Sequence, residues 1–148
     1  MFEINGIKYM IIEKHIDLFK EIELEPCIIF HCVSADKAMG AGIAKPLQDK
    51  FHIRENWNSE QKWNGEGYTV FTSLDNQVIC NLVTKEKYWQ KPTYKTLETA
   101  LKCASKELNT NKIVMPKIGC GLDKLDWNKV KPMIESIFAN YNIVVCYL

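Results

Sequence analysis

The most constraining feature of the sequence is an apolar, β-favouring run, Cys27–Val33, that leads into the glycine segment Gly40-Ala41-Gly42. A near-continuous apolar run is typical of a strand that is covered on both faces of a sheet. The same order recurs at Lys112–Met115, which leads into Gly119-Cys120-Gly121. A segment with helical periodicity follows each glycine segment, and strands that alternate with helices predict an α/β domain with a mixed sheet.

The remaining elements follow from hydrophobic periodicity and turn residues. The predicted helices cover Ile43–Phe51, residues 53–64, Thr93–Leu108 and Asp126 to about Phe138. The further predicted strands cover Gly6–Glu13, Tyr68–Leu74, Gln77–Thr84 and Ile143–Leu148. Asp75-Asn76 predicts a hairpin between the middle two of these strands. Pro46 requires a place in the first turn of its helix, because proline has no backbone N–H to donate.

Length and charge narrow the class of protein. The 148 residues suit one domain, which we expect to span residues 1–148. The 19 Lys and Arg residues balance 18 Asp and Glu residues, and a net charge of +1 argues against a general nucleic-acid binder. No secretory signal is recognisable, and no apolar run approaches the ~18–20 residues that a membrane span needs. We therefore expect a cytoplasmic protein with no membrane partner.

The cysteines predict free thiols. Without a secretory signal we expect a reducing compartment, and four of the six cysteines lie in apolar runs, where free cysteine behaves as a small hydrophobe. No C-x-x-C pair occurs and the three histidines are scattered, so neither a metal nor another cofactor is expected. His31-Cys32 also fails the pattern of a cysteine-dependent phosphatase loop, because position 38 is Ala where that chemistry requires Arg.

The two glycine segments point to an anionic ligand. Loops at the carboxyl ends of strands form the ligand crevice of α/β folds, and glycine lets backbone N–H groups approach an anion closely. Two such loops at one edge of a sheet suit a diphosphate. The chain has no P-loop, and Gly40-Ala41-Gly42 lacks the third glycine of the dinucleotide motif, since position 45 is Lys. Glycines that only turn the chain are the alternative interpretation.

A basic, aromatic stretch, Lys85–Lys95, follows the strand predicted to end at Thr84. Its four lysines against one glutamate suit an anionic ligand despite the near-neutral total, and a solvated surface is the alternative. Asp123 places an acid at the edge of the second glycine segment, where a turn or helix-entry role is the alternative.

These residues resemble those of the macrodomain family. Phe30–Ala44 is similar to the first ligand loop of macrodomains. Thr84-Lys85, Lys91–Tyr94 and Met115–Asp123 narrow the resemblance to terminal ADP-ribose protein glycohydrolases, with the related DNA-directed macrodomain hydrolases and ADP-ribose-1″-phosphate phosphatases. The resemblance runs from about residue 7 to residue 148.

The resemblance implies a three-layer α/β/α macrodomain with a central mixed sheet, which binds ADP-ribose at the carboxyl ends of the central strands. It implies two catalytic residues, Lys85 and Asp123. It also matches Asp17 to the acid that accepts from the adenine amino group, although Ile16 stands where most macrodomains have Gly. The other implied binding residues are Leu18, Ser34, Met39, Gly40, Ala41, Gly42, Ile43, Thr84, Pro116, Ile118, Gly119, Cys120, Gly121 and Leu122.

The chemistry of this residue pair favours hydrolysis. A lysine amine attacks a glycosyl ester carbon once desolvation or a neighbouring cation, for which Lys87 is a candidate, lowers its pKa. In the mechanism that the resemblance implies, Lys85 forms an adduct with the distal ribose and Asp123 resolves it as acid and base. Cys120 has no cation or histidine partner recognisable in the sequence, so we do not expect it to act as a thiolate.

We therefore expect an ADP-ribose-binding hydrolase that removes mono-ADP-ribose from acidic protein side chains or from nucleic acid. The open alternatives are an ADP-ribose-1″-phosphate phosphatase, a reader that binds ADP-ribose without chemistry, and another nucleotide-binding α/β domain. The expected partners are ADP-ribose and ADP-ribosylated protein or nucleic acid as substrates. We expect a monomer with no obligate protein partner.

Overall fold

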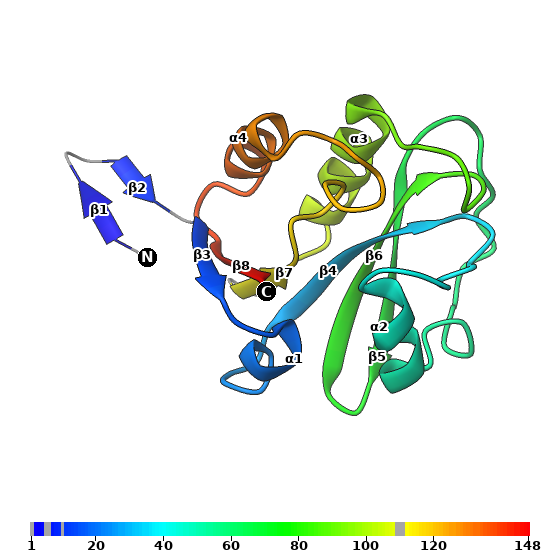
Figure 1. Ribbon diagram of the computed structural model, residues 1–148, viewed down its shortest axis with the longest axis horizontal. Helices are drawn as coiled ribbons and strands as arrows, with labels where there is room; N and C mark the ends of the chain where they lie inside the picture. Colours follow the sequence, from blue (N-terminus) through cyan, green and yellow to red (C-terminus); the bar gives the residue numbers. More distant parts are fainter. Residues whose placement is uncertain (1, 5–6, 10, 109–111) are drawn as a thin grey trace.

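A six-stranded mixed sheet organises the computed structural model, which describes residues 2–4, 7–9, 11–108 and 112–148 (Figure 1). The strands from one edge to the other are β3 (Ile11–His15), β8 (Asn142–Tyr147), β7 (Lys112–Met115), β4 (Ile28–Ser34), β6 (Gln77–Lys85) and β5 (Tyr68–Leu74). All neighbours from β3 to β6 are parallel, and β5 is antiparallel to β6. The carboxyl ends of the five parallel strands therefore meet at one edge of the sheet.

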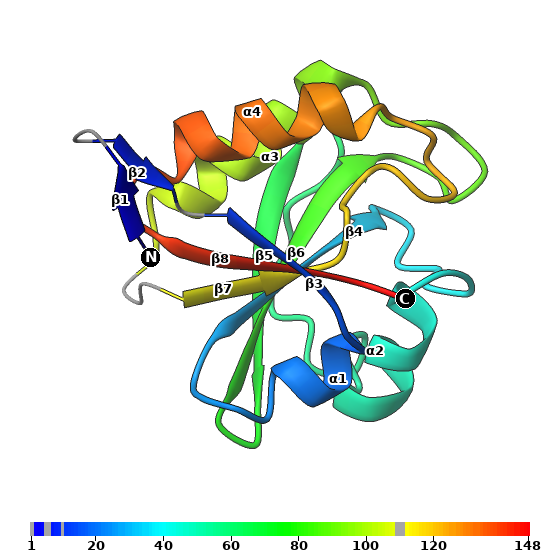
Figure 2. The ribbon, with the colours of Figure 1, turned by 60° about the vertical axis from the view of Figure 1, so that its left-hand side comes forward.

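Helices cover both faces of the sheet, which gives the predicted three layers (Figure 2). One face carries α1 (Leu18–Glu21) and α2 (Ala44–Phe51), and the other carries α3 (Tyr94–Ser105) and α4 (Trp127–Ile137). Successive residues of β4 serve different layers: Ile29 packs in the core that contains Leu47 of α2, whereas Phe30 packs in the core that contains Leu97 of α3. Burial on both faces explains the continuous apolar run of β4. Within the described residues, no helix has the length and apolar character that crossing a membrane requires.

The helix starts agree with the sequence prediction. The Thr93 hydroxyl accepts from the backbone N–H of Thr96 at 3.0 Å at the start of α3, and the Asp126 carboxylate accepts from the N–H of Asn128 at 2.9 Å at the start of α4. Pro46 lies in the first turn of α2, as its missing N–H requires. The α3 helix ends at Ser105, before the predicted end.

Two of the predicted elements differ from the structure. The helix predicted over residues 53–64 is wrong, because a turn over residues 53–56 is followed by irregular chain. Trp57 and Trp63 each pack against the core on the α2 side, so these aromatic residues anchor a loop instead of forming a helix face. The range predicted as one strand over Gly6–Glu13 contains β2 (Ile7–Tyr9), which pairs antiparallel with β1 (Phe2–Ile4), and the start of β3; Gly6 and Met10 lie outside the described residues.

A buried polar cluster interrupts the core on the α2 side, between β4, β6 and β5. Asn81 donates from Nδ2 to the Val70 carbonyl at 2.9 Å and to the Thr72 hydroxyl at 3.0 Å, so its oxygen faces His31 Nε2, 2.6 Å away. The His31 ring is fully buried, and its Nδ1 has no hydrogen-bond partner within the described part of the chain. Burial lowers the pKa of His31 to about 4, although the bond to Asn81 opposes the shift.

Candidate active site

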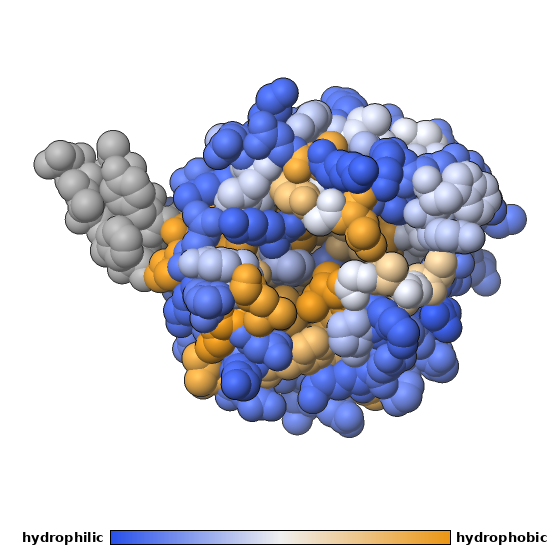
Figure 3. Space-filling model, viewed as in Figure 1, coloured by the Kyte–Doolittle hydropathy of each residue, from blue (hydrophilic) through white to orange (hydrophobic). Residues whose placement is uncertain are grey.

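A cleft of about 670 Å³ lies where the loops after β4, β6 and β7 meet. Its walls come from the first glycine loop (residues 34–43), the basic loop (residues 85–92) and the second glycine loop (residues 116–125). Figure 3 shows that this face of the molecule is hollowed, with hydrophobic residues along the hollow and hydrophilic residues around it. The volume is within the range of roughly 300–1,000 Å³ that small-molecule sites occupy.

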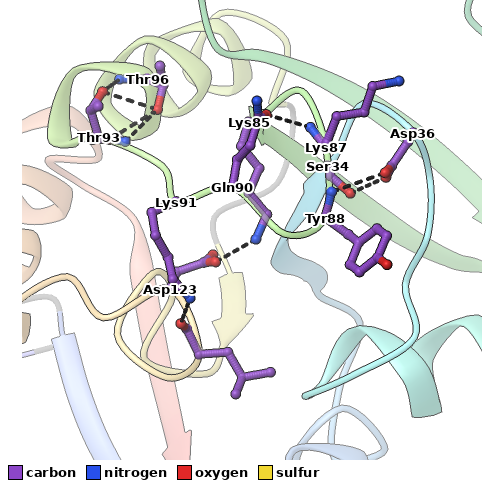
Figure 4. Close-up of polar contacts among 11 residues, drawn as sticks. Ser34, Asp36, Lys85, Lys87, Tyr88, Gln90, Lys91, Thr93, Thr96 and Asp123 are labelled. Carbon is purple, nitrogen blue, oxygen red and sulfur yellow. Dashed lines mark hydrogen bonds and ion pairs between the residues drawn. The ribbon is translucent and has the colours of Figure 1, made fainter.

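Lys85 and Asp123 form an ion pair at the wall of this cleft. The distance from Lys85 Nζ to Asp123 Oδ1 is 2.7 Å, and the two side chains are only 14% and 15% exposed (Figure 4). Lys85 is the last residue of β6, and Asp123 lies in the second glycine loop after β7. Because β6 and β7 both flank β4, their parallel carboxyl ends bring together two residues that are far apart in the sequence.

The first glycine loop has an unusual backbone. Lys37 and Met39 have φ angles of 60° and 45°, and Gly42 has a φ angle of 60°. Left-handed conformations are common for glycine but unfavourable for residues with a Cβ. Met39 is nevertheless 94% buried in the core on the α2 side, so its side chain anchors the loop from below.

Asp36 connects the first glycine loop to the basic loop. Its carboxylate accepts hydrogen bonds from the Ser34 hydroxyl and from the Tyr88 N–H at 3.0 Å (Figure 4). It also accepts from the Ala38 N–H at 3.2 Å. Burial alone would raise the pKa of Asp36, but these hydrogen bonds outweigh it and lower the pKa. The charged carboxylate therefore joins two walls of the cleft.

The second glycine loop is held mainly by its own backbone. The Leu125 N–H donates to the Gly119 carbonyl at 2.7 Å, and the Cys120 N–H donates to the Lys117 carbonyl at 3.1 Å. Gly119 has a φ of +74°, and an added Cβ there would meet Leu125 Cδ1 at 3.0 Å, so this position requires glycine. Two side chains of the basic loop also reach it: Lys85, through its ion pair with Asp123, and Lys91, whose Nζ donates to the Leu122 carbonyl at 2.6 Å.

The thiols beside the cleft are not activated. Burial, with a smaller contribution from the Asp126 charge, raises the pKa of Cys120 to about 11. Burial and the Asp123 charge also raise the pKa of Cys32, which lines the cleft. Within the described ranges, no group of three or more His, Cys, Asp or Glu residues is arranged to hold a metal ion.

Most of the residues that the resemblance implied line the cleft. Besides Lys85 and Asp123, they are Ser34, Met39, Gly40, Ala41, Gly42, Ile43, Pro116, Ile118, Gly119, Gly121 and Leu122. Four others do not line it: Asp17, Leu18, Thr84 and Cys120. Asp17 instead caps α1 by accepting from the Phe19 N–H at 2.9 Å, and Leu18 and Thr84 are buried.

The structure also adds Lys117, which lines the cleft after β7 and which the sequence did not single out. Tyr88 and Trp89, the aromatic residues of the basic stretch, line the cleft as well and are about two-thirds exposed. Lys87 lines a separate hollow instead, so it is not placed as the neighbouring cation of Lys85. Arg54 donates hydrogen bonds to backbone carbonyls of the first glycine loop. The one hint in the sequence was that Arg54 is its only arginine.

We compared the sequence and the structure with those of known proteins. No family model matches the chain. The ADP-ribose glycohydrolase OARD1 of Homo sapiens and that of Bos taurus are each 37% identical over 118 residues, which are 78% of this chain and 76% of each relative. Among solved structures, the macrodomain of Mycobacterium tuberculosis DarG has a TM-score of 0.72 at 21% identity and covers 94% of this chain and 98% of its own. Thermosipho africanus DarTG in complex with ADP-ribose has a TM-score of 0.68 at 16% identity and covers 94% of this chain and 42% of its own.

Proposed function

The chain belongs to the macrodomain family of ADP-ribose glycohydrolases, which are hydrolases, and on this premise we propose that it removes mono-ADP-ribose from acidic protein side chains or from nucleic acid. The observation that carries the proposal is the 2.7 Å ion pair of Lys85 and Asp123 at the cleft wall. A nucleophile beside a group that exchanges protons with it is the arrangement that covalent hydrolysis needs.

The first half of the reaction is displacement at C1″ of the distal ribose. A bound substrate excludes water from the ion pair, which favours transfer of a proton from the Lys85 ammonium to Asp123. The neutral amine attacks C1″ and forms a C–N bond, while the C1″–O bond to the protein carboxyl group breaks. The departing carboxylate keeps the bonding electrons and takes the proton from Asp123.

The second half returns both residues to their starting state. Asp123 accepts a proton from water as the water oxygen bonds to C1″, and the C–N bond to Lys85 breaks with its electrons returning to nitrogen. Asp123 then gives its proton to the amine, which restores the ion pair. The net change is the addition of one water molecule across the ester, and no residue outside the pair has to exchange a proton.

The loops around the pair suit the rest of the ligand. In this proposal the second glycine loop, where Gly119 keeps the backbone free of a Cβ, lies along the diphosphate. The first glycine loop lies along the distal ribose. Lys91 and Lys117, which both line the cleft, add positive charge where an anionic ligand enters.

A panel assay tests the proposal. The wild type, Lys85→Ala and Asp123→Ala proteins are each given a glutamate-modified protein, ADP-ribosylated single-stranded DNA and ADP-ribose-1″-phosphate. We expect the wild type to release ADP-ribose from the protein or the DNA, and each variant to be at least ~100-fold slower, in line with the contribution of positioned acid–base groups. Lys102→Ala, an exposed lysine on α3 paired with Glu98, is the matched control and should keep full activity.

Intact-protein mass spectrometry separates the two roles. Asp123→Ala should form a covalent ADP-ribose adduct on Lys85 slowly, because Asp123 also takes the Lys85 proton, and should accumulate it because the variant cannot resolve it; Lys85→Ala should form none. Full activity of the double variant would contradict the mechanism. Release of phosphate alone would favour the phosphatase, and binding of ADP-ribose without turnover of any substrate would favour a reader.

A further inference from the structure

We propose that Arg54 is a positioning residue, which holds the first glycine loop in the shape that binds ADP-ribose; this inference rests on the proposed function. Arg54 lies in the turn after α2, and it is not among the residues that line the cleft. It therefore acts on the ligand through the loop backbone.

A single guanidinium group holds two consecutive peptide units. Arg54 Nε donates to the Lys37 carbonyl at 2.8 Å, and Arg54 Nη2 donates to the Ala38 carbonyl at 2.9 Å. The guanidinium is planar and its donors point in fixed directions, so the two bonds together set the orientation of both carbonyls. A lysine ammonium carries the same charge without this fixed geometry.

The backbone at these two peptide units needs such support. Lys37 and Met39, on either side of Ala38, both have positive φ angles. Left-handed conformations are unfavourable for a residue with a Cβ, so they persist only where the surroundings hold them. Buried Met39 holds one side of the loop, the Asp36 carboxylate holds the Ala38 N–H, and Arg54 holds the two carbonyls.

The direction of the carbonyls determines where the amides point. In a planar trans peptide the N–H is opposite to the C=O, so the Met39 N–H points away from Arg54 when the Ala38 carbonyl faces it. Among the hydrogen bonds of the described residues, none is donated by the amides of Met39, Gly40, Ala41 or Gly42. These residues line the cleft, so their amides are free to donate to the oxygens of a bound ligand.

Arg54 is itself held in place by α2. Its backbone N–H donates to Gln48 Oε1 at 2.9 Å, and Gln48 Nε2 donates to Glu55 Oε2 at 3.0 Å. Gln48 is buried, so this arrangement is fixed to the body of the protein. The α2 helix begins directly after the first glycine loop, and the turn that follows α2 places Arg54 against the same loop.

Binding and kinetics of three variants test the proposal. We expect Arg54→Ala to bind ADP-ribose about 10-fold more weakly in calorimetry, since it loses two hydrogen bonds from a charged donor that are partly weakened by exposure to solvent. Arg54→Lys should lie between Arg54→Ala and wild type. Lys45→Ala, which removes an exposed cation of α2 that pairs with Asp49, should bind as wild type does.

The kinetic signature separates positioning from a general loss of structure. Among the hydrogen bonds and ion pairs of the described residues, none joins Arg54 to Lys85 or Asp123, so Arg54→Ala should raise KM about 10-fold while kcat stays within about 2-fold. Low millimolar guanidinium should restore part of the affinity of Arg54→Ala and should not affect wild type. Equal affinity of Arg54→Ala and wild type would overturn the proposal, and so would wild-type affinity of Arg54→Lys, because charge alone would then be sufficient.

A readout without ligand keeps this inference distinct from the proposed function. The protease Lys-C cleaves after lysine, and Lys37 lies inside the loop that Arg54 holds. Cleavage after Lys37 should be faster in Arg54→Ala and in Arg54→Lys than in wild type or Lys45→Ala. Failure of the wild type to bind ADP-ribose would contradict the proposed function alone, whereas unchanged cleavage after Lys37 would contradict the role of Arg54.

Discussion

The two glycine loops follow neighbouring positions of the same sheet edge and have similar short motifs, but they are held in different ways. The first is held from outside by the Arg54 guanidinium, the Asp36 carboxylate and the buried Met39 side chain. The second is held mainly by hydrogen bonds within its own backbone, with Lys91 and the ion pair of Lys85 and Asp123 as added contacts. Asp123, the candidate acid and base, lies on the loop that is held locally.

The comparison shows that a Gly-x-Gly motif does not specify how its loop is made. In the first loop it is the second glycine, Gly42, that has a positive φ, whereas in the second loop it is the first glycine, Gly119. Neither Gly40 nor Gly121 has a positive φ or a neighbour closer than 4.0 Å to an added Cβ. The same Gly-x-Gly pattern thus supplies a positive φ at its last residue in one loop and at its first residue in the other.

The largest expected effect separates chemistry from binding. Asp123→Asn should slow turnover at least ~100-fold while ADP-ribose still binds, since the amide cannot exchange protons as the carboxylate does. Ser34→Ala, in the first loop, should lower turnover less than about 10-fold, since its hydroxyl only donates to Asp36. Initial rates on the glutamate-modified protein measure both, and equal losses in the two variants would remove the distinction between the loops.

The next effect concerns the backbone of the second loop. Gly119→Ala should lower the free energy of unfolding by about 1–3 kcal/mol, because it combines a positive φ with a Cβ contact at 3.0 Å. Gly121→Ala should change it by less than about 0.5 kcal/mol, because an added Cβ there meets nothing within 4 Å. Urea unfolding of the two variants provides the matched comparison, and similar midpoints would contradict it.

A third effect distinguishes the strands beneath the loops. β4, below the first loop, contains the buried His31, whereas β7, below the second, has an apolar buried stretch over Ile113–Met115. The pKa of His31 is about 4 in the folded state against a usual value of 6.5, so the unfolded chain binds the proton first. Stability is therefore full above pH 6.5 and falls as the pH drops toward 4, by about 2 kcal/mol at pH 5.

Urea unfolding at pH 7.5 and pH 5 measures this loss. His31→Gln has no imidazole to protonate and retains a donor for Asn81, so its stability should change less than that of wild type between the two pH values. Equal pH dependence of the two proteins would show that His31 is not responsible.

The smallest effect is expected at Cys120, where the second loop contributes backbone and not a reactive side chain. Since burial raises the pKa of this thiol to about 11, Cys120→Ser should keep turnover within about 2-fold. Alkylation of Cys120 by iodoacetamide, followed by peptide mass spectrometry, should be slow at pH 7.5 and faster as the pH rises toward 11. Rapid alkylation at neutral pH would indicate an activated thiol and contradict this expectation.

Much of the fold could be predicted because its signals are local. The apolar runs of β4 and β7, the Thr93 and Asp126 caps and the turn at Asp75-Asn76 each reside in a few consecutive residues. The segment 53–64 could not be predicted in the same way, because Trp57 and Trp63 pack singly against a core formed by distant strands. Aromatic spacing alone does not distinguish a helix face from two separate anchors.

Some residues of the candidate site could likewise be predicted from the sequence, and others could not. Lys85 and Asp123 could be named in advance through the resemblance to macrodomains, and the structure shows how parallel strands bring them to one edge of the sheet. The contacts of Arg54 could not, because its acceptors are two backbone carbonyls and any residue at positions 37 and 38 supplies those. A hydrogen bond to the backbone has no complementary residue type for a sequence pattern to reveal.

The order of the strands also has a consequence for how the protein is made. β3 is an edge strand of the sheet and pairs with β8, with Ile11 opposite Ile143. Nearly the whole chain must therefore be synthesised before β3 can pair. During synthesis, β4, β5 and β6 can pair with one another before β8 has been made. Until β8 emerges from the ribosome, β3 has no partner strand in the sheet. Contacts between such distant segments slow folding, because loop-closure entropy is lost before they form. Ribosome-bound chains that stop before residue 142 should therefore hold β4–β6 folded and β3 open to protease.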